Sequence, residues 1–176
     1  MERGKNVRPL ALSLTVVGAL ARLAPHAPNF TPVGGTSLFA GARLRGWQAF
    51  ALPLLLMAVT DPLLGGYTIA TPFVYLSFMI NVWIGRRWLK STENPVRIGV
   101  ACLGCSAQFF ILADFGTWLG NWYPHTLAGL AQCYVAAIPY FGRMLAGDLF
   151  YSAVLFGLHA WLSRTLRTAE RVPVAA

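Results

Sequence analysis

Charged residues are scarce in this sequence, and their scarcity excludes most soluble proteins. Only 11% of the 176 residues are Asp, Glu, Lys or Arg, against about 25% in soluble domains. Just six are acidic, which leaves a formal net charge of +8. The basic residues come in small groups between apolar runs and form no stripe with interleaved aromatic residues, so we expect no nucleic-acid partner.

Cysteine is scarce as well. The three cysteines, Cys102, Cys105 and Cys133, are odd in number and lie in or beside apolar stretches, so no disulfide framework is predicted. Cys102 and Cys105 have the Cys-x-x-Cys spacing of zinc sites, but the second pair that such a site needs is missing. We interpret all three as small packing residues and predict neither a bound metal nor another cofactor.

The motifs of common enzymes are missing too. The sequence contains no His-Glu-x-x-His zinc helix, no Gly-x-Ser-x-Gly elbow and no Walker phosphate loop, so nucleotide hydrolysis is not expected. An intramembrane enzyme would need a loop histidine, His26 or His125, within hydrogen-bond reach of a carboxylate. Asp61 and Asp114 are candidates, but sequence alone brings neither of them within hydrogen-bond reach of a histidine, so this hypothesis ranks third. We predict no enzyme activity.

Hydrophobic residues, in contrast, are abundant. They make up 56% of the sequence, and the mean hydropathy is +0.56. Apolar runs separated by prolines and glycines predict an all-α integral membrane protein with about six crossings, in one transmembrane domain over residues 1–176. The predicted helices cover about 9–24, 32–44, 47–64, 72–89, 96–114 and 143–163.

Two segments fit this pattern poorly. The run 32–44 would make only about 20 Å of helix, against about 30 Å of hydrocarbon in a bilayer, so this helix begins earlier, thins the bilayer or crosses half of it. Segment 115–141 is long for a loop, and Pro139 interrupts its apolar second half. We predict there an outer loop that holds a surface helix, or a re-entrant segment.

Lysine and arginine indicate the orientation of the chain. Twelve of the 14 fall at one end of the predicted bundle, in groups at 3–8, 43–45, 86–97 and 164–171. The positive-inside rule then places both termini in the cytoplasm, in a multi-pass protein of the inner (plasma) membrane. Only Arg22 and Arg143 fall at the outer ends of the helices.

The predicted outer ends hold most of the distinctive polar side chains. An ionised group inside the bilayer costs about 3 kcal/mol or more, so such residues usually face a cavity, a partner or water. We therefore predict a solute-binding pocket that opens outside. Its candidate lining is Arg22, His26, Asn29, Asp61, Tyr67, Asp114, Trp118, Asn121, His125, Arg143 and Asp148.

Several of these candidates have an equally ordinary structural interpretation. Trp118 suits the aromatic belt at a membrane interface. Asp61 precedes Pro62 and so also suits the end of a helix. Asp148 follows Arg143 by about one helical turn, and the two could form a local ion pair.

Several longer segments carry a resemblance to a known family. They include Arg22-Leu-Ala-Pro-His-Ala-Pro-Asn-Phe-Thr-Pro, Thr60-Asp-Pro-Leu-Leu-Gly-Gly-Tyr, Gly129-Leu-Ala-Gln-Cys-Tyr and Gly147-Asp-Leu. Over most of its length the chain resembles an uncharacterised family of small bacterial membrane proteins that are described as transport proteins. The resemblance implies transport but names no solute.

The predicted architecture is also distantly similar to the substrate-binding S components of energy-coupling-factor (ECF) transporters. That likeness implies six helices, a vitamin-like substrate near the outer face, and an energising transmembrane subunit with ATPases as partner. S components dock through small residues of the first helix. Ala11, Thr15 and Ala19 match that stripe, with Thr15 in place of an alanine, although such a stripe also suits packing within the bundle.

Two functional hypotheses follow. The first is a membrane substrate-binding subunit or small transporter that takes up a vitamin-like or other small organic solute from the outer face. The alternative is a non-catalytic accessory subunit that stabilises a larger membrane protein complex. In that case the aromatic residues and the small-residue stripe only make contacts with other subunits of the complex.

Overall fold

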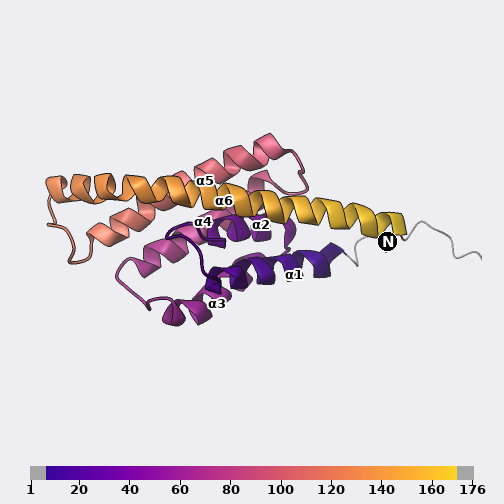
Figure 1. Cartoon of the computed structure of the whole chain (residues 1–176), viewed down its shortest axis with the longest axis horizontal. Coiled ribbons are helices and arrows are strands. Elements are labelled where there is room, and N and C mark those ends of the chain that lie inside the picture. The colour runs from indigo at the N-terminus through magenta and orange to yellow at the C-terminus, as the bar shows by residue number, and fades with distance from the viewer. Residues whose placement is uncertain (1–6, 170–176) are drawn as a thin grey trace, which may run out of the picture.

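The computed structural model describes residues 7–169, and this part of the chain is all-helical, as predicted (Figure 1). Five of its six α-helices lie within a few residues of the predicted runs, and the last one is much longer than predicted. Two short 3₁₀ turns, η1 (Ala21–Leu23) and η2 (Asp61–Leu63), continue α1 and α3. The helices are α1 (Val7–Leu20), α2 (Val33–Arg43), α3 (Gln48–Thr60), α4 (Thr71–Trp88), α5 (Pro95–Trp118) and α6 (Leu127–Ala169).

The connections between helices lie at two ends of the bundle. The α2–α3 and α4–α5 connections lie at the end where α1 begins and α6 finishes (Figure 1). There Arg86 donates to the Gly46 carbonyl oxygen at 3.1 Å, and Arg164 pairs with Glu93 at 2.6 Å. We call this the basic end. The opposite end holds η1, η2 and the α5–α6 turn.

The short helix α2 lies at the centre of the bundle. Its residues from Val33 to Ala42 are all buried, and it contacts each of the other five α-helices. Its 11 residues make about 16 Å of helix, about half the hydrocarbon thickness of a bilayer. Of the alternatives for the run 32–44, an earlier start is wrong, and the structure has a half-length helix.

Two glycines bring α2 and α4 into backbone contact. A Cβ atom added at Gly41 would clash with the carbonyl oxygen of Val82, and one added at Gly85 would clash with that of Leu38. Small residues at a helix crossing let two backbones approach closely. The buried position of α2 therefore depends on the absence of side chains at these two positions.

The last helix begins at Leu127, not near residue 143 as predicted, so the segment 115–141 contains the end of α5 and the first part of α6. α6 is one helix of 43 residues that continues through Pro139. A proline removes one helical N–H donor, and packing against a neighbouring helix can offset that loss. α5 supplies such a neighbour, since the Tyr134 hydroxyl donates to the Ile111 carbonyl oxygen at 2.6 Å.

Two of the described helices, α5 and α6, are long and apolar enough to cross a membrane. Only 28% of the most apolar window of α5, and 33% of that of α6, is buried inside the bundle. A core helix of a soluble protein would be mostly buried, so these outward apolar faces suit lipid better than water. The six predicted crossings are not confirmed, because the other described helices are shorter or less apolar.

The close crossing of α2 and α4 predicts a strong effect of one methyl group. Gly85→Ala should lower the free energy of unfolding by about 1–3 kcal/mol, because the new Cβ meets backbone that cannot rotate away. Gly104→Ala on α5 is the control, since a Cβ there has no neighbour within 4 Å. Chemical unfolding in detergent micelles measures both, and equal stability of the two variants would contradict the close crossing.

Candidate functional site

The contacts of the predicted site residues fall into separate groups. Arg22, Asp61 and Tyr67 meet at the end of the bundle opposite the basic end. Asp148 lies in the centre, while Trp118 and His125 belong to the α5–α6 turn. Of the other predicted lining residues, Asn121 also lies in this turn and is exposed, Asp114 is partly buried, and His26, Asn29 and Arg143 are exposed.

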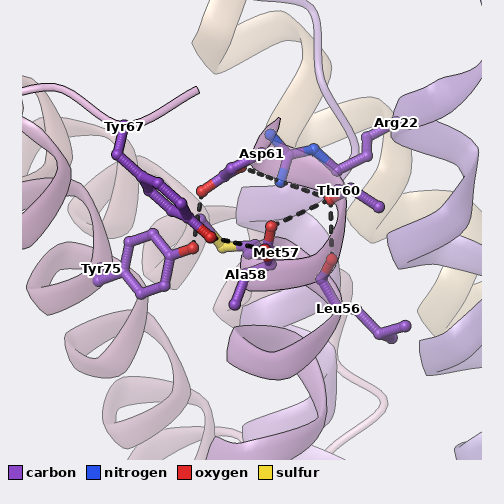
Figure 2. A network of polar contacts seen from close by, with 8 residues as sticks. All are labelled: Arg22, Leu56, Met57, Ala58, Thr60, Asp61, Tyr67 and Tyr75. Carbon is purple, nitrogen blue, oxygen red and sulfur yellow. Dashed lines mark hydrogen bonds and ion pairs between the residues drawn. The ribbon is translucent and has the colours of Figure 1, made fainter. Parts of the chain in front are cut away.

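The Arg22–Asp61 network connects the ends of α1, α3 and α4 (Figure 2). Arg22 of η1 forms an ion pair with Asp61 of η2, with 2.8 Å between Nη1 and Oδ1. The same Nη1 donates to the Thr60 hydroxyl at 3.1 Å, and the Tyr75 hydroxyl of α4 donates to Asp61 Oδ2 at 2.7 Å. The two ionised side chains are only 15% and 13% exposed, so water screens their attraction less than at the surface.

Both oxygens of the Asp61 carboxylate are thus occupied within the network, by Arg22 and by Tyr75. Tyr67 is 59% exposed, and its hydroxyl donates to the Ala58 carbonyl oxygen at 2.7 Å. In this state the network holds helix ends together. Sequence reasoning missed Tyr75, because a tyrosine inside an apolar run carries no sign of its partner.

Asp148 of α6 is buried in the centre of the bundle, with 3% of its surface exposed. The Ser106 hydroxyl of α5 donates to its Oδ2 at 2.7 Å, and the backbone N–H of Gly35 donates to the same carboxylate. Gly34 lies so close that a Cβ atom there would clash with the carboxylate. Asp148 therefore faces the first turn of α2, where the helix dipole favours a negative charge.

Arg43 stands at the other end of α2 with the opposite charge. Its Nη1 donates to the Leu89 carbonyl oxygen at 3.0 Å, and its Nη2 donates to that of Thr92. Its Cζ also lies 4.8 Å from the centroid of the Phe156 ring. A cation at a helix C-terminus complements the dipole. The sequence identified Arg43 only as an orientation signal, so this contact between α2, α6 and the α4–α5 connection was missed.

The predicted local pair between Arg143 and Asp148 does not form. Arg143 is exposed, and its Cζ lies 5.9 Å from the centroid of the Tyr140 ring. Five residues along an α-helix rotate a side chain by about 140°, so the two residues occupy different faces of α6. Asp148 points into the bundle, and Arg143 points away from it.

Contacts within the α5–α6 turn hold two predicted site residues in place, Trp118 at the end of α5 and His125 in the turn. The Trp118 Nε1–H donates to the Pro124 carbonyl oxygen at 3.0 Å, and its indole lies 5.6 Å from the His125 ring. His125 Nε2 lies 3.0 Å from the Gly120 carbonyl oxygen. These contacts give both side chains a structural role in the turn.

A polar contact between α4 and α5 was also missed. The Gln108 Nε2–H₂ group donates to Asn81 Oδ1 at 2.7 Å and to the Ser77 carbonyl oxygen at 3.0 Å. Asn81 is 1% exposed, so this contact lies in the interior. Single polar residues within apolar runs do not reveal which face they occupy. Other buried polar side chains of the described residues are Thr15, Thr36, Ser37, Ser152, His159 and Ser163.

The small-residue stripe of helix α1 packs inside the bundle. Ala11, Thr15 and Ala19 are 1%, 0% and 5% exposed. Neighbouring helices therefore cover all three, and in this structure the stripe presents no surface to a docking partner.

A hollow of about 290 Å³ lies between α5 and α6 near the basic end, and no predicted lining residue contributes to it. Among residues 7–169, no three His, Cys, Asp or Glu side chains come together as a metal site requires. In the interior of the part of the chain that the structure describes, the polar groups therefore form hydrogen bonds around one buried carboxylate, that of Asp148.

A double-mutant cycle tests the Arg22–Asp61 network. Arg22→Ala and Asp61→Ala should each lower the free energy of unfolding, and the double variant should lose less than the sum of the two single losses, with a coupling of about 0.5–3 kcal/mol.

Tyr75→Phe should lower the free energy of unfolding by about 1.5–3 kcal/mol, because it removes a hydrogen bond to a charged group. Chemical unfolding in detergent micelles gives all these values, and strictly additive losses in the Arg22–Asp61 cycle would rule out that direct contact.

Comparison with known proteins gives a family but no activity. A family model, described as a family of unknown function (DUF6580), matches residues 4–171. No curated protein and no solved structure matches the chain. Since the matched residues span nearly the whole sequence, the chain belongs to this family of unknown function, DUF6580.

Proposed function

We propose that the chain is a multi-pass membrane protein with about six membrane-embedded helices and both termini in the cytoplasm. It binds a small organic solute, such as a vitamin-like molecule, as a small transporter or as the substrate-binding subunit of one. The observation that carries the proposal is the half-length helix α2, whose N-terminus meets the buried Asp148 inside an otherwise apolar bundle.

The exterior of the bundle supports the membrane placement. Soluble monomers rarely expose large contiguous apolar surfaces. Here each of the five helices around α2 has large exposed hydrophobic side chains, while arginines gather at the basic end as the positive-inside rule requires of a cytoplasmic face. Examples on α1, α3, α4, α5 and α6 are Val17, Leu55, Trp83, Ile111 and Val154.

The centre of the bundle supports solute binding. A carboxylate inside a membrane bundle is costly and usually marks the path of a substrate or an ion. Helices that stop at mid-membrane are typical of transporters, in which their free N-terminal N–H groups bind polar groups of the substrate. A bundle that only contacted other proteins would gain little stability from burying Asp148. An apolar side chain of similar size at that position would stabilise the bundle at least as well.

In the proposal, the Arg22–Asp61 network closes the outer end of the bundle. It connects the ends of α1, α3 and α4, and only segment 24–32 separates η1, which contains Arg22, from the first turn of α2. Opening of the ion pair would free this segment and, through it, the N-terminus of α2 beside Asp148. In the proposal, solute capture is therefore coupled to a switch between two packed states of the bundle, one with the ion pair closed and one with it open.

One observation favours the alternative of an accessory subunit. α6 is about 64 Å long, so it exceeds the thickness of a bilayer, and its first turns expose large apolar side chains. Val135 and Ile138 are 66% and 58% exposed, and Leu127 is 85% exposed. Such a surface suits contact with a second membrane protein.

Native mass spectrometry of the gently extracted full chain separates the two functions. The proposal expects a retained small molecule that is lost in Asp148→Asn, because the neutral amide cannot replace the buried charge. Arg143→Gln, an exposed position on the same helix, should keep it. A protein partner in fixed stoichiometry, with no small molecule in either variant, would support the accessory role and contradict solute binding.

Cysteine labelling in intact cells tests the orientation. A membrane-impermeant maleimide should label Asn121→Cys from outside, whereas Lys90→Cys should react only after the cells are opened, because it lies at the basic end. The native cysteines are all buried and give little background. Labelling of Lys90→Cys in intact cells would reverse the proposed orientation.

A further inference from the structure

The hollow between α5 and α6 has one polar end and apolar walls. Its rim at the basic end is the ion pair of Arg164 with Glu93, whose side chains are 73% and 45% exposed. Further in, Gly99 of α5 and Gly157 of α6 leave open space, since a Cβ atom added at either would meet nothing within 4 Å. The hollow is thus a narrow groove between α5 and α6, formed where each helix has a glycine; we also call this groove the slot.

Away from the rim, the lining of the slot contains a polar pair whose members contact each other. The pair is Ser152 and Cys102, whose side-chain oxygen and sulfur atoms lie 3.7 Å apart. On α5 the lining extends from Pro95 to Cys102, which is about 10 Å along the helix. An occupant therefore lies parallel to the helices, with a polar group at the rim and an apolar part directed towards the bundle centre.

We propose that this groove binds one acyl chain of an anionic phospholipid, with the headgroup phosphate at Arg164. The groove lies between the two helices that are long and apolar enough to cross a membrane, so its open side faces lipid. The guanidinium of Arg164 has five N–H donors, and the contact with Glu93 leaves most of the side chain exposed for a phosphate.

Size and charge favour a lipid over the side of a partner helix. The volume of about 290 Å³ is at the lower limit of small-molecule sites, whereas a helix with its side chains is about 10 Å across. Exposed basic residues near the rim, Lys90 and Arg97, add positive charge for a headgroup. The inference rests on the membrane placement in the proposed function and is independent of solute binding.

Lipid titration followed by native mass spectrometry tests the groove. The full chain in detergent is mixed with dioleoylphosphatidylglycerol, or with dioleoylphosphatidylcholine, which has the same chains and no net charge. We expect one phosphatidylglycerol per chain to be retained most tightly. Gly157→Leu fills the slot and should weaken this binding by about tenfold or more. Gly104→Leu, at an equally open position outside the slot, should leave it unchanged.

The variant Arg164→Gln distinguishes the contribution of the lipid headgroup to binding from that of the acyl chain. It should abolish the preference for phosphatidylglycerol over phosphatidylcholine while binding of the uncharged lipid persists, and millimolar inorganic phosphate should not displace the lipid. Equal binding by Gly157→Leu and Gly104→Leu, with unchanged thermal melts, would overturn the site. So would displacement by free phosphate, or a protein partner bound in place of lipid. If the protein retains no small-molecule solute but still binds the lipid, solute binding is contradicted and the lipid site stands.

Discussion

The carboxylate of Asp148 receives the N-terminus of α2 inside the bundle, and the arrangement of the other helices depends on this contact. The first N–H groups of any helix lack partners within the helix. In α2 the N-cap residue is Pro32, and no side chain of the cap itself forms a hydrogen bond. Buried without an acceptor, these N–H groups would each cost about 1–3 kcal/mol. Asp148, distant in sequence, takes the place of a local cap.

The remaining helices pack around α2 because α2 is held there. Its side chains belong to both larger apolar clusters: Leu38 and Phe39 to the one that reaches α5 and α6, and Ala40 to the one that reaches α1 and α3. Glycines at the crossing with α4 let the backbones touch, and Arg43 complements the C-terminal end of the dipole. A buried helix with opposite charges at its two ends is thus compatible with apolar surroundings.

The sequence predicted the helical runs well because each run is bounded by proline, glycine or clustered charge. It also indicated that the run 32–44 was too short to cross a bilayer, which the 11 residues of α2 bear out. The error in the start of the last helix arose from Pro139, since contacts with α5 that keep α6 helical there are invisible in a local pattern.

The site was less predictable, for a similar reason. Arg22, Asp61 and Tyr67 do meet, but Tyr75 and Asn81 gave no signal, because a polar residue in an apolar run can face lipid, a partner or the core. Asp148 was identified as a candidate, yet its partner in α2 is a backbone N–H group. Backbone donors leave no mark in composition or spacing, so the half-helix contact became visible only in three dimensions.

Backbone amide hydrogen exchange of the protein in lipid nanodiscs tests the Asp148–α2 contact most directly. Amides of the first turn of α2 should exchange as slowly as those of buried parts of α5. Asp148→Leu, which removes the acceptor, should accelerate them selectively. If the same amides exchange as fast as the connection 64–70 in the unmodified protein, or ignore the loss of the carboxylate, then α2 is not held at its N-terminus by Asp148.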